Sequence, residues 1–179
     1  AVEGIEGHTE TIWQLLRKYQ IPTFFFINKM DREGANVSQV FEDIKTHLTN
    51  HICDITQSFK QRNMDEHLIE QIAEYDERLL EIYFTEGYNQ ALWLQTFKTL
   101  IKAHQLFPVA YGSALHDQGL LEFLDQFLHL TETHYDTDAP FSARVYKIRH
   151  DEHGNRVTII KRFSGARHVR ELIIFLGKE

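Results

Sequence analysis

The sequence predicts an α/β fold followed, beyond about residue 137, by an antiparallel β segment. Two observations on the spacing of apolar residues predict this fold. Up to residue 130, apolar side chains recur at helical spacing in several segments, and short apolar runs typical of buried strands precede the loops at residues 28 and 113. After Pro140 the spacing changes to two, as expected for strands with one buried face.

The first predicted elements are a helix over residues 8–19 and a strand over residues 22–27. Ile12, Leu15, Leu16 and Tyr19 share one helical face. Thr9 or Thr11 is expected near the helix start, and Pro22 marks the exit into the strand. A second amphipathic helix is expected from Val37 to Leu48.

The next predictions are a short strand over residues 52–60, a helix over 64–84 and a further helix over 92–101. Gly87 separates the two helices. A second buried strand is expected at residues 107–112, and a last helix over 119–130 precedes a polar linker. Beyond it, alternating runs at 141–148, 157–160 and 169–176 predict strands joined by turns at Gly154 and Gly165.

A candidate base-recognition loop, Asn28-Lys29-Met30-Asp31, directly follows the first apolar run. The Asp31 carboxylate can accept hydrogen bonds from guanine N1–H and from its exocyclic amino group, a donor pair that adenine lacks. Asn28 can reach the N7 edge of the base, and the stem of Lys29 can lie along one ring face. The loop therefore predicts guanine recognition.

A second candidate loop, Ser113-Ala114-Leu115, follows the second predicted strand. We expect the Ala114 backbone N–H to meet guanine O6, Leu115 to cover the other ring face, and Ser113 to brace Asp31 through a hydrogen bond. An ordinary strand end is the alternative for this segment alone. The two loops in this order, each after a strand, favour a guanine site.

These motifs resemble those of translational GTPases of the elongation factor G type. The segments that carry the resemblance are residues 1–19, Ile21-Pro22, residues 25–32, Phe107-Pro108-Val109, Gly112-Ser113-Ala114 and residues 141–148. Within that group the chain looks most like the ribosomal-protection tetracycline-resistance proteins, and release factor 3 is a further relative. The resemblance implies the C-terminal half of a P-loop GTPase G domain (residues 1–136) with a helical insert at about 52–104, followed by the start of an antiparallel β-barrel domain (residues 137–179).

The resemblance also implies what the complete protein does. It would bind GTP or GDP with magnesium, associate with ribosomal RNA and proteins, and act in the cytoplasm, either in ribosomal protection from tetracycline or in elongation. A noncatalytic RNA- or protein-binding module that keeps the GTPase fold is the alternative.

Phosphate chemistry needs a G-x-x-x-x-G-K-[ST] loop, and the sequence does not contain one. The only Gly-Lys pair, Gly177-Lys178, is followed by glutamate, and neither D-x-x-G match, at Asp31 or Asp151, lies upstream of the guanine loop. We therefore expect the chain to be an excised piece without hydrolytic activity, to hold no tightly bound nucleotide, and to self-associate through apolar surface left open.

Composition is that of a chain with a packed core, with 42% hydrophobic residues and one cysteine, Cys53, which cannot form an internal disulfide. No apolar run is long enough to span a membrane, and no leader-like segment is present. Residues 1–137 carry 10 Lys/Arg against 21 Asp/Glu, whereas residues 138–179 carry 9 against 5. The basic part alternates in a way that predicts cations on one sheet face, suited to a polyanion, with a solvated hairpin as the alternative.

No metal site is expected. His47 and His51 have the spacing of a zinc-binding helix, but Leu48 stands where the glutamate of H-E-x-x-H would be, and no third ligand is evident. The remaining histidines are scattered along the chain. A pair of surface histidines is the simpler interpretation.

Overall fold

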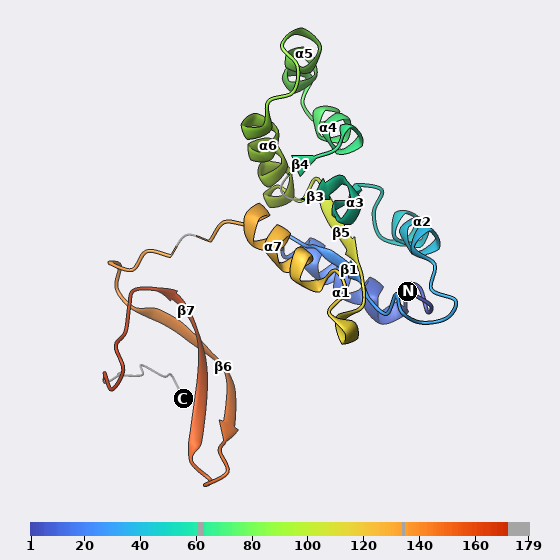
Figure 1. The fold of residues 1–179 in the computed structure, drawn as a ribbon. Helices are drawn as coiled ribbons and strands as arrows, with labels where there is room; N and C mark the ends of the chain where they lie inside the picture. Colours follow the sequence, from blue (N-terminus) through green and yellow to red (C-terminus); the bar gives the residue numbers. More distant parts are fainter. Residues whose placement is uncertain (61–62, 134, 172–179) are drawn as a thin grey trace. The chain divides into compact units, whose positions relative to one another are not determined.

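The computed structural model describes residues 1–60, 63–133 and 135–171 (Figure 1). The chain divides into two compact units, Ala1–Glu132 and Thr133–Glu179.

The centre of the first unit is a three-stranded parallel sheet in the order β1-β5-β2. Its strands are β1 (Phe25–Ile27), β5 (Phe107–Tyr111) and β2 (Ile52–Asp54). In the register, Phe26 lies opposite Ala110 and Cys53 lies opposite Pro108. The central strand β5 is buried over its first four residues, which explains its continuous apolar run.

Helices cover both faces of the sheet, and the side-chain alternation of the strands divides the core accordingly. Ile27 and Val109 point to a core shared with Trp13 of α1 (Gly7–Lys18) and Ile44 of α2 (Val37–His47). Ala110 and Cys53 point to the larger core on the other face. That core contains α3 (Ile55–Ser58), α4 (Glu66–Ala73), α6 (Gln90–Lys102) and the end of α7 (Leu120–Leu130).

Of the first two helices, α2 begins with a side-chain cap and α1 does not. The Asn36 side chain accepts a hydrogen bond from Gln39 N at 3.1 Å and caps α2. The N-cap of α1 is Glu6, which makes no side-chain capping bond, and Thr9 lies near the helix start as predicted. Thr11 lies one turn further on, where its hydroxyl donates to Gly7 O at 3.0 Å.

The helical insert is more broken than the periodicity predicted. The strand expected over residues 52–60 is confirmed only at its ends, because Asp54 accepts from Thr56 N and Gln57 N and starts α3 directly after β2. A short hairpin follows, with β3 (Phe59–Lys60) paired to β4 (Asn63–Met64).

The single helix predicted over residues 64–84 is wrong. It is two helices, α4 and α5 (Glu77–Thr85), because Asp76 accepts a hydrogen bond from Arg78 N and caps a new start. Apolar spacing continues through the break, since both helices pack on the same core. The pattern therefore could not reveal the interruption.

The second unit is an antiparallel hairpin of β6 (Ser142–His150) and β7 (Arg156–Ser164). Asp151 accepts from the backbone N–H groups of His153 and Asn155 in the predicted turn, and Gly154 has φ +80°. Most of the third predicted run, residues 172–176, lies outside the described residues. The α/β prediction for the first unit is confirmed, and a β-barrel start in the second unit stays a prediction.

Candidate functional site

The two predicted guanine loops lie side by side at one edge of the sheet. Residues 28–31 follow β1, and residues 113–115 follow β5, its parallel neighbour. The carboxyl ends of parallel strands meet at the same sheet edge, where α/β folds bind their ligands (Figure 1).

Asn28 connects the two loops. Its side-chain Oδ1 accepts from Lys29 N at 2.7 Å and from Ala114 N at 2.9 Å. The second bond spans 86 positions in sequence. With its oxygen engaged, the Asn28 side chain presents its amide N–H groups as donors.

The backbone of the first loop is held in an uncommon conformation. Lys29 has φ +66°, in the left-handed region, and Met30 N donates to Gly112 O at 3.1 Å. Glu3 lies 3.7 Å from Lys29 Nζ and 3.8 Å from Arg32. These contacts leave the Lys29 side chain about half exposed, with its stem free to cover a planar ligand.

Asp31 lies beside Ser113, as the sequence suggested. The Ser113 hydroxyl is the largest influence that lowers the pKa of the Asp31 carboxyl, and the Asp31 backbone N–H adds to it. Ser113 Oγ is nevertheless fully buried and finds no partner of full hydrogen-bond geometry among the described residues. The hydroxyl is thus close enough to favour the ionised form of Asp31, although the contact falls short of full hydrogen-bond geometry.

The turn after β5 contributes three residues that the sequence did not single out as site residues. Ser113 N donates to Gln118 O at 2.9 Å, and Gln118 N donates back to Ser113 O at 3.0 Å. A Cβ on Gly112 would lie 2.0 Å from Gln118 O, so the turn closes only over glycine. His116 Nε2 lies 3.6 Å from Asp31 Oδ2. Only the small-residue run Gly112-Ser113-Ala114 could have indicated this closure.

The structure also places the two groups of the second loop that were expected to contact the base, the Ala114 N–H and the Leu115 side chain. The Ala114 N–H, expected to meet guanine O6, is donated to Asn28. Leu115 is 83% exposed, with its side chain available to cover a ring. All six predicted site residues therefore lie in the two adjoining loops, and a base would share the Ala114 donor with Asn28.

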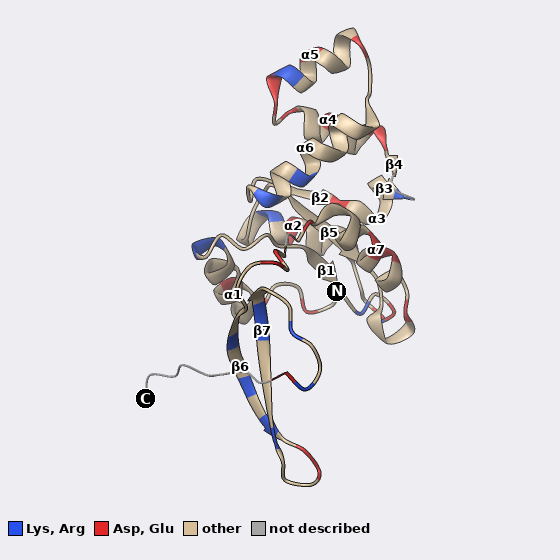
Figure 2. Cartoon of the chain, turned by 90° about the vertical axis from the view of Figure 1, so that its left-hand side faces the viewer, with Lys and Arg blue, Asp and Glu red and all other residues tan. Residues whose placement is uncertain are grey.

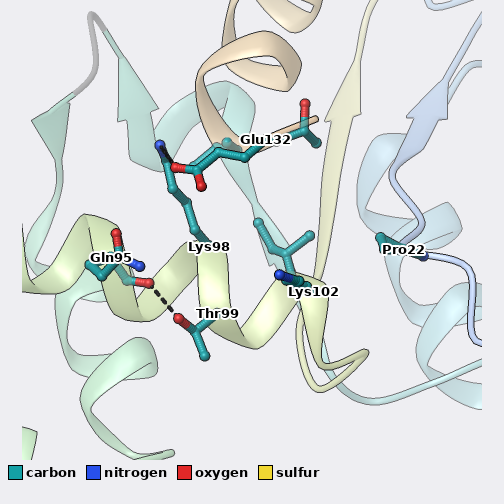
Figure 3. Close-up of a pocket in the computed structure, with 9 residues that line it drawn as sticks. Pro22, Gln95, Lys98, Thr99, Lys102 and Glu132 are labelled. Atoms are coloured by element: carbon teal, nitrogen blue, oxygen red, sulfur yellow. Dashed lines mark hydrogen bonds and ion pairs between the residues drawn. The ribbon is translucent and has the colours of Figure 1, made fainter. Parts of the chain in front are cut away.

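A separate pocket of about 360 Å³ lies elsewhere in the first unit (Figure 3). Pro22, Lys102 and the ion pair between Lys98 and Glu132, at 3.0 Å, contribute to its lining. Neither guanine loop reaches it. It carries no part of the candidate site.

No group of three or more histidine, cysteine or acidic side chains with metal-binding geometry occurs among the described residues. His47 Nδ1 lies 3.0 Å from Asp43 O, and His51 Nδ1 lies 2.9 Å from the Tyr75 hydroxyl. The two histidines thus have separate local partners. Within the described part of the chain, no helix is both long and apolar enough to cross a membrane.

The sequence model of the elongation factor Tu GTP-binding domain matches residues 1–133. The chain belongs to this family of translational GTPases.

Its curated relatives include tetracycline resistance proteins. TetM from transposon Tn1545 of Enterococcus faecalis is 30% identical over 189 residues, and TetS of Listeria monocytogenes is 27% identical over 190 residues. Both alignments cover 100% of this chain, which spans 29% of the length of each relative.

A crystal structure of a protein from Thermus thermophilus shares the fold, with a TM-score of 0.72 and 21% sequence identity. The match covers 90% of this chain and 30% of that one.

Proposed function

We propose that this chain is the guanine-recognition half of the G domain of a translational GTPase. The observation that carries the proposal is the Asn28 side chain, which accepts from Ala114 N at 2.9 Å and so joins the two loops into one site. Asp31 and the buried Ser113 hydroxyl lie beside each other at the same place. Family membership supports GTP and GDP as the ligands.

The site would read guanine by hydrogen bonding. Asp31, held ionised by its lowered pKa, accepts from N1–H and the exocyclic amino group. The Asn28 amide donates to N7, while the Ala114 N–H serves O6. Lys29 covers one ring face and Leu115 the other.

A P-loop binds the phosphates and the magnesium ion of a nucleotide, and this sequence does not contain a P-loop motif. We assign no residue of this chain to them. The role of these residues is therefore to bind and orient the base, and we expect no GTP hydrolysis by this chain alone.

Calorimetric titration of the chain with GDP, GMP and AMP tests the proposal. We expect weak binding that favours both guanine nucleotides over AMP. GDP and GMP should bind alike, because this chain offers the second phosphate no P-loop. Equal affinity for AMP would contradict guanine recognition through Asp31.

For the complete protein we propose a cytoplasmic, ribosome-associated role in protection from tetracycline or in elongation. Similarity to TetM and TetS over the full chain supports the first role. We assign residues 1–136 to the G domain, with the insert at about 52–104, and residues 137–179 to the start of a β-barrel. Expression of the gene that encodes this chain in a tetracycline-sensitive host tests the first role: unchanged tetracycline sensitivity would contradict it.

A noncatalytic RNA-binding role is a second candidate, favoured by one face of the β6–β7 hairpin. In the strand register, Arg144 lies opposite Lys161, Lys147 opposite Ile159, and Arg149 opposite Val157. Residues 157, 159 and 161 are two positions apart along β7, so their side chains project from the same face of the hairpin. Residues opposite them share that face, and all four cations therefore lie on it. A register shift between Val145 and Lys147 makes this possible, since strict alternation would place Arg144 and Lys147 on opposite faces.

The four cations form no ion pair with any described residue, and Figure 2 shows basic residues along both strands. Such a face suits phosphates. Replacing Arg144 and Lys161 with glutamine should weaken the salt dependence of binding to single-stranded RNA. The slope of log K against log[salt] should become less negative by roughly 0.7 per lost phosphate contact. Lys18 and Lys45 of the first unit, replaced in the same way, are the control. Equal effects of both double variants would contradict an RNA role for the hairpin.

A further inference from the structure

The pocket of about 360 Å³ in Figure 3 lies at the opposite edge of the central sheet from the guanine loops. Pro22 precedes β1, and the other lining residues belong to α6, to the end of α7 and to the two residues after α7. The guanine loops, in contrast, follow the carboxyl ends of β1 and β5. Small-molecule sites have volumes of about 300–1,000 Å³, so this pocket has room for a small ligand of its own.

The chain segments that form the pocket are basic, although residues 1–137 carry 10 Lys/Arg against 21 Asp/Glu. Four of those ten cations lie in residues 17–23 and 95–105, which contain no Asp or Glu. They are Arg17, Lys18, Lys98 and Lys102. The third segment, residues 127–132, adds one acidic side chain, Glu132. This local excess of positive charge favours an anionic ligand.

The two lysines that line the pocket differ in how far they are already neutralised. Lys98 Nζ lies 3.0 Å from Glu132 Oε1, and only 21% of the Lys98 side chain is exposed. Lys102, one turn further along α6, forms no ion pair with a described residue. Lys102 is not needed to cap the helix, because backbone N–H groups after α6 donate to the carbonyls of its last turn at 2.8–3.1 Å. The pocket therefore offers one uncompensated cation, which suits one negative charge.

Two threonine hydroxyls in the pocket are left as hydrogen-bond acceptors. Thr99 Oγ1 donates to Gln95 O at 2.9 Å (Figure 3), and Thr131 Oγ1 donates to Phe127 O at 2.7 Å. Since a hydroxyl has a single proton, each oxygen can only accept from a ligand. A ligand ammonium group could donate to them, but Lys102 would repel it. Ligand hydroxyls are therefore the donors that fit.

We propose that this pocket binds a polyhydroxy monocarboxylate, the class of small anion to which sugar acids belong. Its carboxylate would pair with Lys102, and its hydroxyls would donate to the oxygens of Thr99 and Thr131. Its carbon chain would pack on the apolar part of the lining, which includes Ile101 and Leu130. A phosphate monoester fits less well, because it carries close to two negative charges and the pocket has one free cation.

The test titrates the whole chain with gluconate and follows the backbone amide signals by NMR. We expect saturable shifts of the signals of Thr99, Lys102 and Thr131. Two probes with six carbons each remove one half of the recognition: sorbitol has no carboxylate, and hexanoate has no hydroxyl. Sorbitol should bind at least about tenfold more weakly than gluconate, and hexanoate at least about threefold more weakly.

A charge variant locates the carboxylate. Lys102→Gln should weaken the binding of gluconate and of hexanoate alike, by about tenfold, because both lose a hydrogen bond to a charged group. Lys18→Gln is the matched control, since Lys18 belongs to the same basic segments but does not line the pocket. Its replacement should change either affinity less than about twofold.

A hydroxyl variant locates the hydroxyl groups. Thr99→Val should weaken gluconate binding by roughly two- to tenfold and leave hexanoate binding unchanged, because only gluconate donates to the threonine oxygen. Thr96→Val is the matched control: Thr96 also lies on α6 and makes the same bond, to Leu92 O at 3.0 Å, but it does not line the pocket. The helical circular dichroism signal checks that each variant folds.

Three results would overturn the proposal. They are the absence of saturable gluconate binding, sorbitol or hexanoate binding as tight as that of gluconate, and equal losses for the pocket variants and their controls. None of these outcomes bears on guanine recognition, because the pocket shares no residue with the two guanine loops.

Discussion

Asp31 is the residue on which base selectivity depends. Its carboxylate lies beside a fully buried hydroxyl, and Asn28 holds the neighbouring loop against it. A carboxylate accepts hydrogen bonds and cannot donate them, so it matches the two donors on one edge of guanine. Selectivity at this site is therefore a matter of donor and acceptor pattern.

Asp31→Asn should change the base preference of the site from guanine to xanthine. An amide offers one acceptor and one set of donors, which suits xanthine, whose carbonyl replaces the guanine amino group. We expect GMP affinity to fall at least about tenfold, because a hydrogen bond to a charged group is lost, and xanthosine monophosphate to bind better than GMP. Calorimetry with both ligands measures this, and Asp117→Asn is the control. An unchanged preference for GMP would show that Asp31 does not contact the base.

The lowered pKa of Asp31 sets the pH dependence of GMP binding. Because the folded pKa lies below the ordinary value, the ionised carboxylate contributes fully above that ordinary value and is lost only as pH falls through the lowered pKa. GMP affinity should therefore stay level from neutral pH through the ordinary range of an aspartate. Ser113→Ala should raise the pH at which affinity is lost, as measured by titration at stepped pH. A midpoint that does not move would contradict the role of Ser113.

At the scale of elements, the turn after β5 has the least room for change. Gly112→Ala would place a Cβ 2.0 Å from a backbone oxygen, that of Gln118. We expect a loss of about 1–3 kcal/mol in the free energy of unfolding, the typical cost of overpacking, together with weaker GMP binding as Ser113 shifts.

Chemical denaturation of Gly112→Ala beside Gly7→Ala measures the effect. Gly7 begins α1 and has open space where a Cβ would lie, so its replacement should be neutral or slightly stabilising. Equal stabilities of the two variants would contradict the tight closure of the turn.

Sequence periodicity identified the elements that bury an uninterrupted stripe and failed where polar caps interrupt one. The helix over residues 37–47 and the strand over 107–111 were predicted because their apolar spacing is regular and their ends carry clear signals. Asp54 and Asp76 each begin a new helix inside an apolar pattern that continues across the break. A single aspartate is too common a residue to be recognised as a cap in advance.

The candidate site was predictable to a similar extent. The loops at 28–31 and 113–115 each follow an apolar strand, so the sequence indicated both. Pairing of β1 with β5 depends on contacts between distant residues, and the roles of Gln118 and His116 arise only from that pairing. A local pattern contains no information on such contacts.

At the scale of the whole molecule, the first unit presents more apolar surface than its described core requires. Among the described residues, strand β1 pairs on one side only, with β5. Exposed apolar side chains lie on α1 and α7, among them Leu15, Leu121 and Leu128, and the exposed Tyr19 directly follows α1. Open strand edges and apolar helix faces favour association between copies.

We therefore expect the chain to self-associate with rising concentration. Sedimentation velocity over a wide concentration range measures this. Replacing Leu121 and Leu128 with glutamate should shift the distribution toward monomer, and the exposed Val157 of β7, replaced in the same way, is the control. A clean monomer at all concentrations would contradict this prediction.

The most direct test of guanine recognition is a residue-resolved NMR titration of the chain with GMP and with AMP. We expect GMP to shift the amide signals of Lys29, Asp31, Ala114 and Leu115 in a saturable manner, and AMP at the same concentrations to leave them nearly unchanged. The same shifts with AMP, or GMP shifts confined to residues outside these two loops, would contradict guanine recognition at this site.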